Sequence, residues 1–132
     1  MKQLLLVGLG GCFGSIARYK LSGLVLHHAV DWRFPLGTFV VNIMGCLVAG
    51  ILAGLVERHH VLSADTRLLL FTGLLGGFTT FSAFGVETVF LLRRGEILVA
   101  TGYVVLSIVV GVGLLWLGMT IIPAAKNNFP TI

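Results

Sequence analysis

The run of residues 76–87 holds the side chains with the clearest chemical character in this chain. Two adjacent glycines, Gly76 and Gly77, precede the hydroxyl-bearing Thr79, Thr80 and Ser82, all within an apolar segment. Paired glycines weaken a helix, and the backbone groups that a break sets free need partners in a membrane. Such breaks present carbonyls to cations and amides to anions in transporters. Close helix packing through small residues is the alternative explanation.

Two phenylalanines in the same run, Phe81 and Phe84, are three residues apart and therefore share one face of a helix. The edge of an aromatic ring is positive, so it contacts an anion without the strong grip of an ammonium group. Weak contacts suit conduction, because an ion must leave a site as well as enter it. On spacing alone, ordinary packing in a core or against lipid is the commoner explanation.

Two polar side chains interrupt other apolar segments. The carboxamide of Asn42 is costly in hydrocarbon unless it is paired, so it donates either to an anion or to a neighbouring helix. Arg18 either extends to the membrane interface or sets a positive potential at a vestibule. Both residues are therefore candidates for an ion pathway and for structural roles.

Three more residues could extend a polar path. Glu87 either pairs with Arg93 or Arg94 or lines such a path. Tyr103 and Ser107 are four residues apart and share a helix face. They either add hydroxyl groups to the path or simply pack.

The elements that must position these side chains are four apolar segments, at residues about 4–26, 36–56, 67–92 and 97–122. Of the 132 residues, 57% are hydrophobic and only 11% are charged, and the mean hydropathy is +1.04. Soluble domains carry about 25% charged residues. The sequence therefore predicts an all-α membrane protein with a single four-helix domain over residues 1–132, whose third helix is broken near its middle.

Lys and Arg, which normally set membrane orientation, divide almost evenly between the two sides of this arrangement. One side carries Lys2, Arg58, Arg67 and Lys126, and the other carries Arg18, Lys20, Arg33, Arg93 and Arg94. We therefore expect dual topology, in which the chain inserts in both orientations. Because four helices enclose little beyond their own side chains, a pathway would be shared with an inverted second copy.

Several function classes find little support. No Ser/His/Asp or Cys/His set and no carboxylate pair lies within plausible reach in the sequence, so we do not expect an enzyme. The scattered basic residues fit lipid headgroups better than nucleic acid. Two histidine pairs are expected in solvated loops, and both cysteines are expected to be buried. These residues are His27, His28, His59, His60, Cys12 and Cys46.

Two alternatives to a channel stay open. A small multidrug-type exporter is one, although the first apolar segment lacks the embedded acidic residue that proton coupling would use. The other is a non-conducting structural membrane subunit, whose glycine-rich helices would pack against a larger partner.

Three motifs resemble the Fluc/CrcB family of fluoride channels. The first is Gly10-Gly11-x-x-Gly14-x-x-x-Arg18-Tyr19, the second is Pro35-Leu36-Gly37-Thr38-x-x-Val41-Asn42, and the third is Gly73-Leu74-Leu75-Gly76-Gly77-Phe78-Thr79-Thr80-Phe81-Ser82-x-Phe84-x-x-Glu87. They occur in the family's order over the first three segments, and the third is the most specific.

The resemblance implies an antiparallel, dual-topology homodimer in the cell inner membrane, exporting fluoride passively through two pores along its interface. Phe81, Phe84 and Asn42 match pore-lining positions, and Arg18 matches the family's first-helix arginine at the vestibule. A central structural Na⁺ is implied, held by the backbone carbonyls of Gly76 and Thr79 from both subunits. The residues that match a polar track are Ser82, Glu87, Tyr103 and Ser107.

Overall fold

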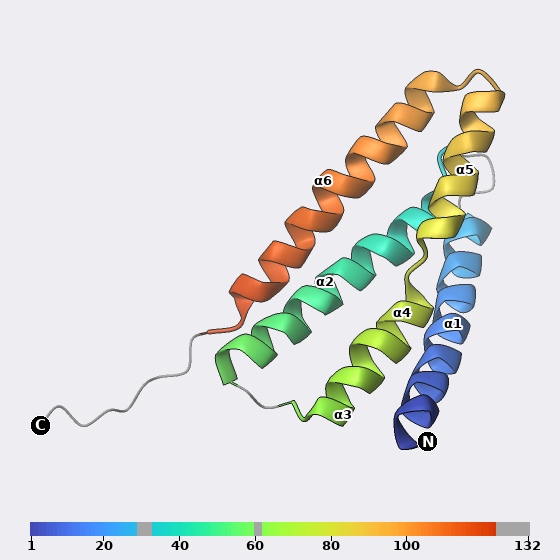
Figure 1. Cartoon of the computed structure of the whole chain (residues 1–132). Coiled ribbons are helices and arrows are strands. Elements are labelled where there is room, and N and C mark those ends of the chain that lie inside the picture. Colours follow the sequence, from blue (N-terminus) through green and yellow to red (C-terminus); the bar gives the residue numbers. More distant parts are fainter. Residues whose placement is uncertain (29–32, 60–61, 124–132) are drawn as a thin grey trace, which may run out of the picture.

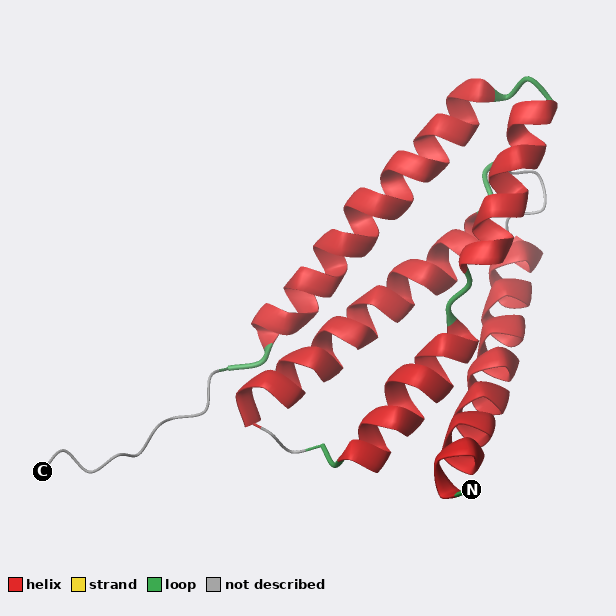
Figure 2. Cartoon of the chain, in the orientation of Figure 1, coloured by secondary structure: helices red, strands yellow, loops and turns green. Residues whose placement is uncertain are grey.

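The computed structural model describes residues 1–28, 33–59 and 62–123, which are helical apart from short connections (Figure 2). Four helical stretches are long and apolar enough to cross a membrane, which confirms the expected all-α architecture. The third stretch changes its helix type and is interrupted. The elements are α1 (Lys2–His28), α2 (Leu36–His59), α3 (Ala64–Arg67), the π-helix η1 (Leu68–Leu75), α4 (Gly76–Phe78), α5 (Phe81–Arg93) and α6 (Ile97–Ile121).

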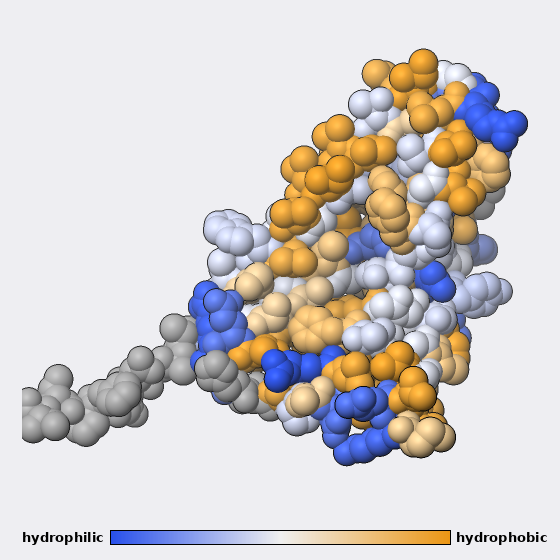
Figure 3. Space-filling view, in the orientation of Figure 1, coloured by the Kyte–Doolittle hydropathy of each residue, from blue (hydrophilic) through white to orange (hydrophobic). Residues whose placement is uncertain are grey.

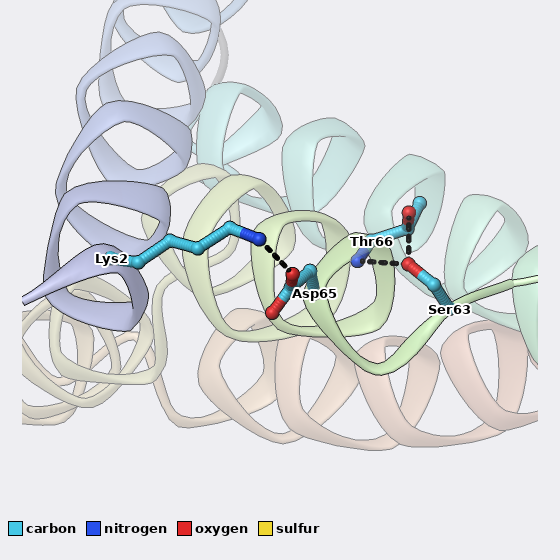
Figure 4. A network of polar contacts seen from close by, with 4 residues as sticks. All are labelled: Lys2, Ser63, Asp65 and Thr66. Carbon is cyan, nitrogen blue, oxygen red and sulfur yellow. Dashed lines mark hydrogen bonds and ion pairs between the residues drawn. The ribbon is translucent and has the colours of Figure 1, made fainter.

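Local chemistry accounts for several helix ends. Pro35 directly precedes α2, and its carbonyl accepts a hydrogen bond of 3.1 Å from the amide of Phe39. The Ser63 hydroxyl accepts from the amide of Thr66 at 3.2 Å and so caps α3 (Figure 4). Gly95 has φ of 75° in the tight turn between α5 and α6, a conformation that favours glycine.

The helices pack as two pairs. α2 runs along α6, while α1 runs along η1 and α4 (Figure 1). Glycines permit both close approaches: a Cβ at Gly10 would lie 2.9 Å from the Cα of Gly73, and one at Gly118 would lie 2.6 Å from the carbonyl oxygen of Leu47. After the interruption, α5 leaves α1 and packs against α6 instead. The two pairs are therefore joined both by the third stretch and by direct packing of α1 against α2.

One end of the molecule collects the start of α1, the end of α6 and the start of α3 (Figure 1). Lys2 forms an ion pair of 2.5 Å with Asp65 (Figure 4). Arg58, in the last turn of α2, donates to the carbonyl of Ile122, and a ring nitrogen of His59 lies 3.1 Å from the carbonyl oxygen of Pro123. These contacts join the start of α1 to the start of α3, and the end of α2 to the end of α6.

Two expectations about single residues were wrong. His27 and His28 lie in the exposed last turn of α1 rather than in a loop, and His59 is the last residue of α2. Cys12 is exposed on α1, whereas Cys46 is half-buried. The helices extend further than apolarity alone indicated, because their ends carry polar residues. His60 lies outside the described residues.

The outer faces of the helices are apolar. Large hydrophobic side chains are exposed on α1, α5 and α6, and Figure 3 shows them along the outer side of α6 with hydrophilic patches at the two ends of the molecule. The buried hydrophobic side chains among the described residues are few by comparison: Val41, Leu75, Leu91, Ala100 and Tyr103. This distribution is that of a multi-pass membrane protein, in which lipid takes the place of a deep core.

Candidate ion-conduction site

The third helical stretch is interrupted at Thr79 and Thr80. Both residues are extended, with φ and ψ of −82° and 156° for Thr79 and −147° and 116° for Thr80 (Figure 2). The amide and the hydroxyl of Thr79 each lie 2.9 Å from the carbonyl oxygen of Leu75, which closes the preceding helix. The Thr80 hydroxyl accepts from the amide of Ala83 at 3.3 Å and starts α5. The interruption is thus a specific arrangement with a cap on each side.

Asn42 on α2 holds this interruption from the side. Its Oδ1 accepts from the amide of Thr80 at 2.9 Å, and its Nδ2 donates to the carbonyl of Thr80 at 3.1 Å. The carboxamide thereby satisfies both backbone groups of one extended residue, which hydrocarbon could not do. One Nδ2 proton is left over for another acceptor.

Two backbone carbonyls next to the interruption lack the donors that a continuous α-helix would give them. In an α-helix, the carbonyl of Gly76 would accept from the amide of Thr80, and that of Thr79 would accept from the amide of Ala83. Here the Thr80 amide donates to Asn42 instead, and the Ala83 amide donates to the Thr80 hydroxyl. The carbonyls of Gly76 and Thr79 therefore lose their helical donors and can face a cation.

Aromatic rings continue from the interruption along α5. The ring centroids of Phe81 and Phe84 are 5.6 Å apart, and those of Phe84 and Tyr103 are 5.0 Å apart. Phe34 then contacts Tyr103 edge-on at 5.2 Å. Phe81 is 84% exposed, although it is a large apolar residue beside a polar break. Apart from its contact with Phe84, its ring is therefore largely uncovered by the rest of the chain.

Glu87 lies beside this row of rings. One carboxylate oxygen accepts from the Thr38 hydroxyl at 2.6 Å and the other accepts from the Tyr103 hydroxyl at 2.7 Å. Thr38 and Tyr103 are both buried. The carboxylate is therefore bound between α2 and α6 rather than paired with Arg93 or Arg94.

Two hollows flank the interruption. A pocket of about 590 Å³ is lined by Arg18 and Lys20 from α1, by Thr38 from α2 and by Thr80. A second pocket of about 300 Å³ is lined by Asn42, Thr79, Thr80 and Phe81. Thr80 thus lies between a hollow lined by basic side chains and a hollow lined by the Asn42 carboxamide and the Phe81 ring.

The remaining predicted residues, Ser82, Ser107 and Arg18, have fewer contacts with the interruption and with Glu87. Ser82 is exposed, and its hydroxyl lies 3.3 Å from that of Thr80. Ser107 is half-buried on α6, and its Oγ has no hydrogen-bond partner among the described residues. Arg18 and Ser107 therefore do not join the hydrogen-bonded groups around Asn42 and Glu87.

Sequence reasoning did not single out two residues that the structure places centrally, Thr38 and Thr80. Thr38 lies four residues before Asn42 and shares its helix face, which is a signal that could have identified it. Thr80 was noted only as a hydroxyl, whereas its backbone carries the contact to Asn42. In the part of the chain that the structure describes, no group of three His, Cys, Asp or Glu side chains could hold a metal.

The family model described as CrcB-like protein, Camphor Resistance (CrcB), matches residues 5–119, which include all of these groups. The chain belongs to the CrcB family. Three CrcB relatives carry the name fluoride-specific ion channel FluC and are named as channels rather than enzymes.

The relative from Methylobacillus flagellatus is 61% identical over 122 residues, covering 92% of this chain and 95% of that protein. Another, from Nitratidesulfovibrio vulgaris, is 44% identical over 119 residues, covering 90% and 95%. A third, from Flavobacterium psychrophilum, is 43% identical over 121 residues, covering 92% and 97%. The resemblance seen in the three CrcB motifs is therefore confirmed over nearly the whole chain.

Proposed function

We propose that this chain forms a fluoride-selective channel that lets cytoplasmic fluoride leave the cell passively and so relieves fluoride toxicity. The row of Phe81, Phe84 and Tyr103 beside the interrupted helix is the observation that carries the proposal. The names of the FluC relatives supply the identity of the ion.

Fluoride is small and strongly hydrated, so its water must be replaced by many weak donors rather than one tight one. The ring edges of Phe81 and Phe84 provide such contacts. The free Nδ2 proton of Asn42 and the hydroxyls of Ser82 and Ser107 add hydrogen-bond donors. Arg18, in the basic hollow, attracts anions before they reach the rings.

The proposed working unit is an antiparallel homodimer in the cell inner membrane. Phe81 is largely uncovered by its own chain, so a pathway along it needs a second wall. The near-even distribution of Lys and Arg supports insertion in both orientations, which an antiparallel pair requires. Reporter fusions to the carboxyl terminus should show similar populations on both sides of the membrane, and one dominant orientation would contradict the proposal.

A structural Na⁺ is proposed at the centre of the dimer. The residues fit such an ion, because the carbonyls of Gly76 and Thr79 have lost their helical donors beside the interruption. Carbonyl oxygens are suitable ligands for a hard cation. When bound, the ion would supply a fixed positive charge that offsets negative charge within the membrane.

The deciding experiment is fluoride efflux from liposomes that contain only this protein, followed with a fluoride electrode, with chloride efflux as the comparison. Fluoride release without chloride release is expected. No release would favour the non-conducting structural subunit. Release that requires a proton gradient would favour the small multidrug-type exporter class.

A further inference from the structure

A shallow groove lies between α5 and α6, away from the interruption. It has a volume of about 210 Å³ and is lined by Thr88 and Leu92 from α5 and by Ala100, Thr101, Val104 and Val105 from α6. Val105 and Leu92 are about half exposed, at 51% and 49%. A groove of this kind on a membrane-spanning surface is open to lipid.

The end of this groove carries concentrated positive charge. Leu92 lines the groove, and the next two residues, Arg93 and Arg94, are both exposed at the end of α5. Neither arginine forms an ion pair with any residue that the structure describes. The neighbouring Glu96 has one carboxylate oxygen buried, so that oxygen does not face the headgroup region. Figure 3 shows a hydrophilic patch at the α5–α6 turn, directly beside apolar surface.

We infer that this groove and the two arginines form a binding site for an anionic phospholipid. Basic pockets between membrane-spanning helices bind acidic headgroups, and Arg presents a planar set of donors that matches a phosphate. The groove supplies contacts for the glycerol and the acyl chain of the same lipid. From Thr88 to Leu92, α5 rises by about 6 Å, which suits the glycerol and the upper part of an acyl chain beneath the headgroup.

The polar residues of the groove lie at the depth expected for the glycerol of a bound lipid. Thr101 is exposed in the first turns of α6 and can donate to a glycerol ester carbonyl, whereas the Thr88 hydroxyl already donates to the carbonyl of Phe84 at 2.8 Å. Leu92 offers apolar contact beside the arginines, and Val105 offers it deeper in the groove. This inference does not depend on which ion the protein conducts, since the groove shares no residue with the two hollows beside Thr80.

Native mass spectrometry of the purified protein tests the inference, with phosphatidylglycerol and phosphatidylcholine of identical acyl chains as probes. The wild-type protein should retain phosphatidylglycerol in preference to phosphatidylcholine. The R93Q/R94Q double variant should bind phosphatidylglycerol about 25-fold more weakly, since each arginine near a membrane surface contributes about a fivefold factor. The K2Q/R67Q variant loses the same charge at the opposite end of the molecule and should bind as the wild type does.

A third variant tests the contribution of the groove separately from that of the two arginines. Thr101→Phe fills the groove but keeps both arginines, so it should also weaken phosphatidylglycerol binding. Circular dichroism checks that each variant keeps its helical content. Equal binding by R93Q/R94Q and K2Q/R67Q, or no preference for phosphatidylglycerol in the wild type, would overturn the site. Unchanged binding by Thr101→Phe, or full competition by inorganic phosphate, would overturn the role of the groove.

Discussion

Asn42 and Thr80 are joined by two hydrogen bonds in opposite directions, 2.9 Å into Oδ1 and 3.1 Å out of Nδ2. A single side chain on α2 therefore satisfies the amide that Thr80 frees where the third helix is interrupted, and it also donates to the Thr80 carbonyl. The consequence reaches beyond Thr80. By taking the Thr80 amide, Asn42 also removes the helical donor of the Gly76 carbonyl.

Replacing Asn42 tests this dependence. Asn42→Ala leaves the amide and the carbonyl of Thr80 without these partners, so we expect a loss of about 1–3 kcal/mol in unfolding free energy together with strongly slowed fluoride efflux. Thermal unfolding in detergent and the liposome assay measure the two effects. Met44→Ala, at an exposed position on the same helix, is the matched control. If Asn42→Ala were fully stable and fully conducting, the interruption of the third helix would not depend on Asn42.

The two phenylalanines can be tested by removing only the ring. Phe81→Ile and Phe84→Ile keep an apolar side chain but lose the positive ring edge, and each should slow fluoride efflux by about tenfold or more. Phe90→Ile provides a control, because Phe90 is 52% exposed on the same helix and lies outside the row of rings. Size-exclusion chromatography should show the same oligomer for all three variants. Efflux at the wild-type rate in both test variants would remove the rings from the mechanism.

The two hydroxyl groups that donate to Glu87 should each contribute to the stability of the protein. Thr38→Val and Tyr103→Phe each deprive one carboxylate oxygen of its donor, and we expect each to cost about 1–3 kcal/mol of stability. Urea or thermal unfolding monitored by circular dichroism measures the change. Thr120→Val alters an exposed threonine near the end of α6 and should have little effect. If Thr38→Val were no more destabilising than Thr120→Val, the bond to Glu87 would contribute nothing to folding.

Close packing of α1 against η1 predicts opposite responses at two neighbouring glycines. A Cβ at Gly10 would lie 2.6 Å from the carbonyl oxygen of Leu69 and 2.8 Å from the amide of Leu74, so Gly10→Ala should destabilise the protein by about 1–3 kcal/mol. A Cβ at Gly8 meets nothing within 4 Å, and Gly8→Ala should be neutral or stabilising. Midpoints of thermal unfolding compare the two variants. Equal midpoints would contradict the packing.

The proposed Na⁺ predicts a cation dependence of stability as well as of flux. If the carbonyls of Gly76 and Thr79 bind Na⁺, the unfolding midpoint should be higher in Na⁺ than in N-methylglucamine at equal ionic strength. Fluoride efflux should fall when a larger monovalent cation replaces Na⁺. An identical midpoint and full efflux without Na⁺ would both count against a required ion.

Much of the architecture could be predicted from local patterns. The four membrane-spanning stretches follow from hydropathy, and the cap at Ser63 follows from residue type. The sequence predicts an interruption near Gly76 and Gly77, but both glycines are helical in α4 and the extended residues are Thr79 and Thr80. The π-helical form of η1 could not be predicted, because π-helices are rare and its apolar residues fit an α-helix equally well.

The partners of the polar residues could not be predicted either. Asn42 and Thr80 are 38 residues apart, and Thr38 and Glu87 are 49 apart. The types of these residues show that each needs a partner in a membrane, but the choice of partner depends on how α2 crosses the third stretch. Residue type thus identified Asn42 and Glu87 as candidates without identifying what they bind.

The third stretch belongs to both helix pairs, since η1 and α4 pack on α1 whereas α5 packs on α6. During synthesis, α1, η1 and α4 can therefore associate before α6 has been made, whereas α5 can contact only α2, through Thr38 and Glu87, until the last helix is present. The two extended threonines then act as a joint that allows one membrane span to assemble in two stages. A chain truncated before α6 should consequently insert with its first pair formed and with α5 lacking its main partner helix.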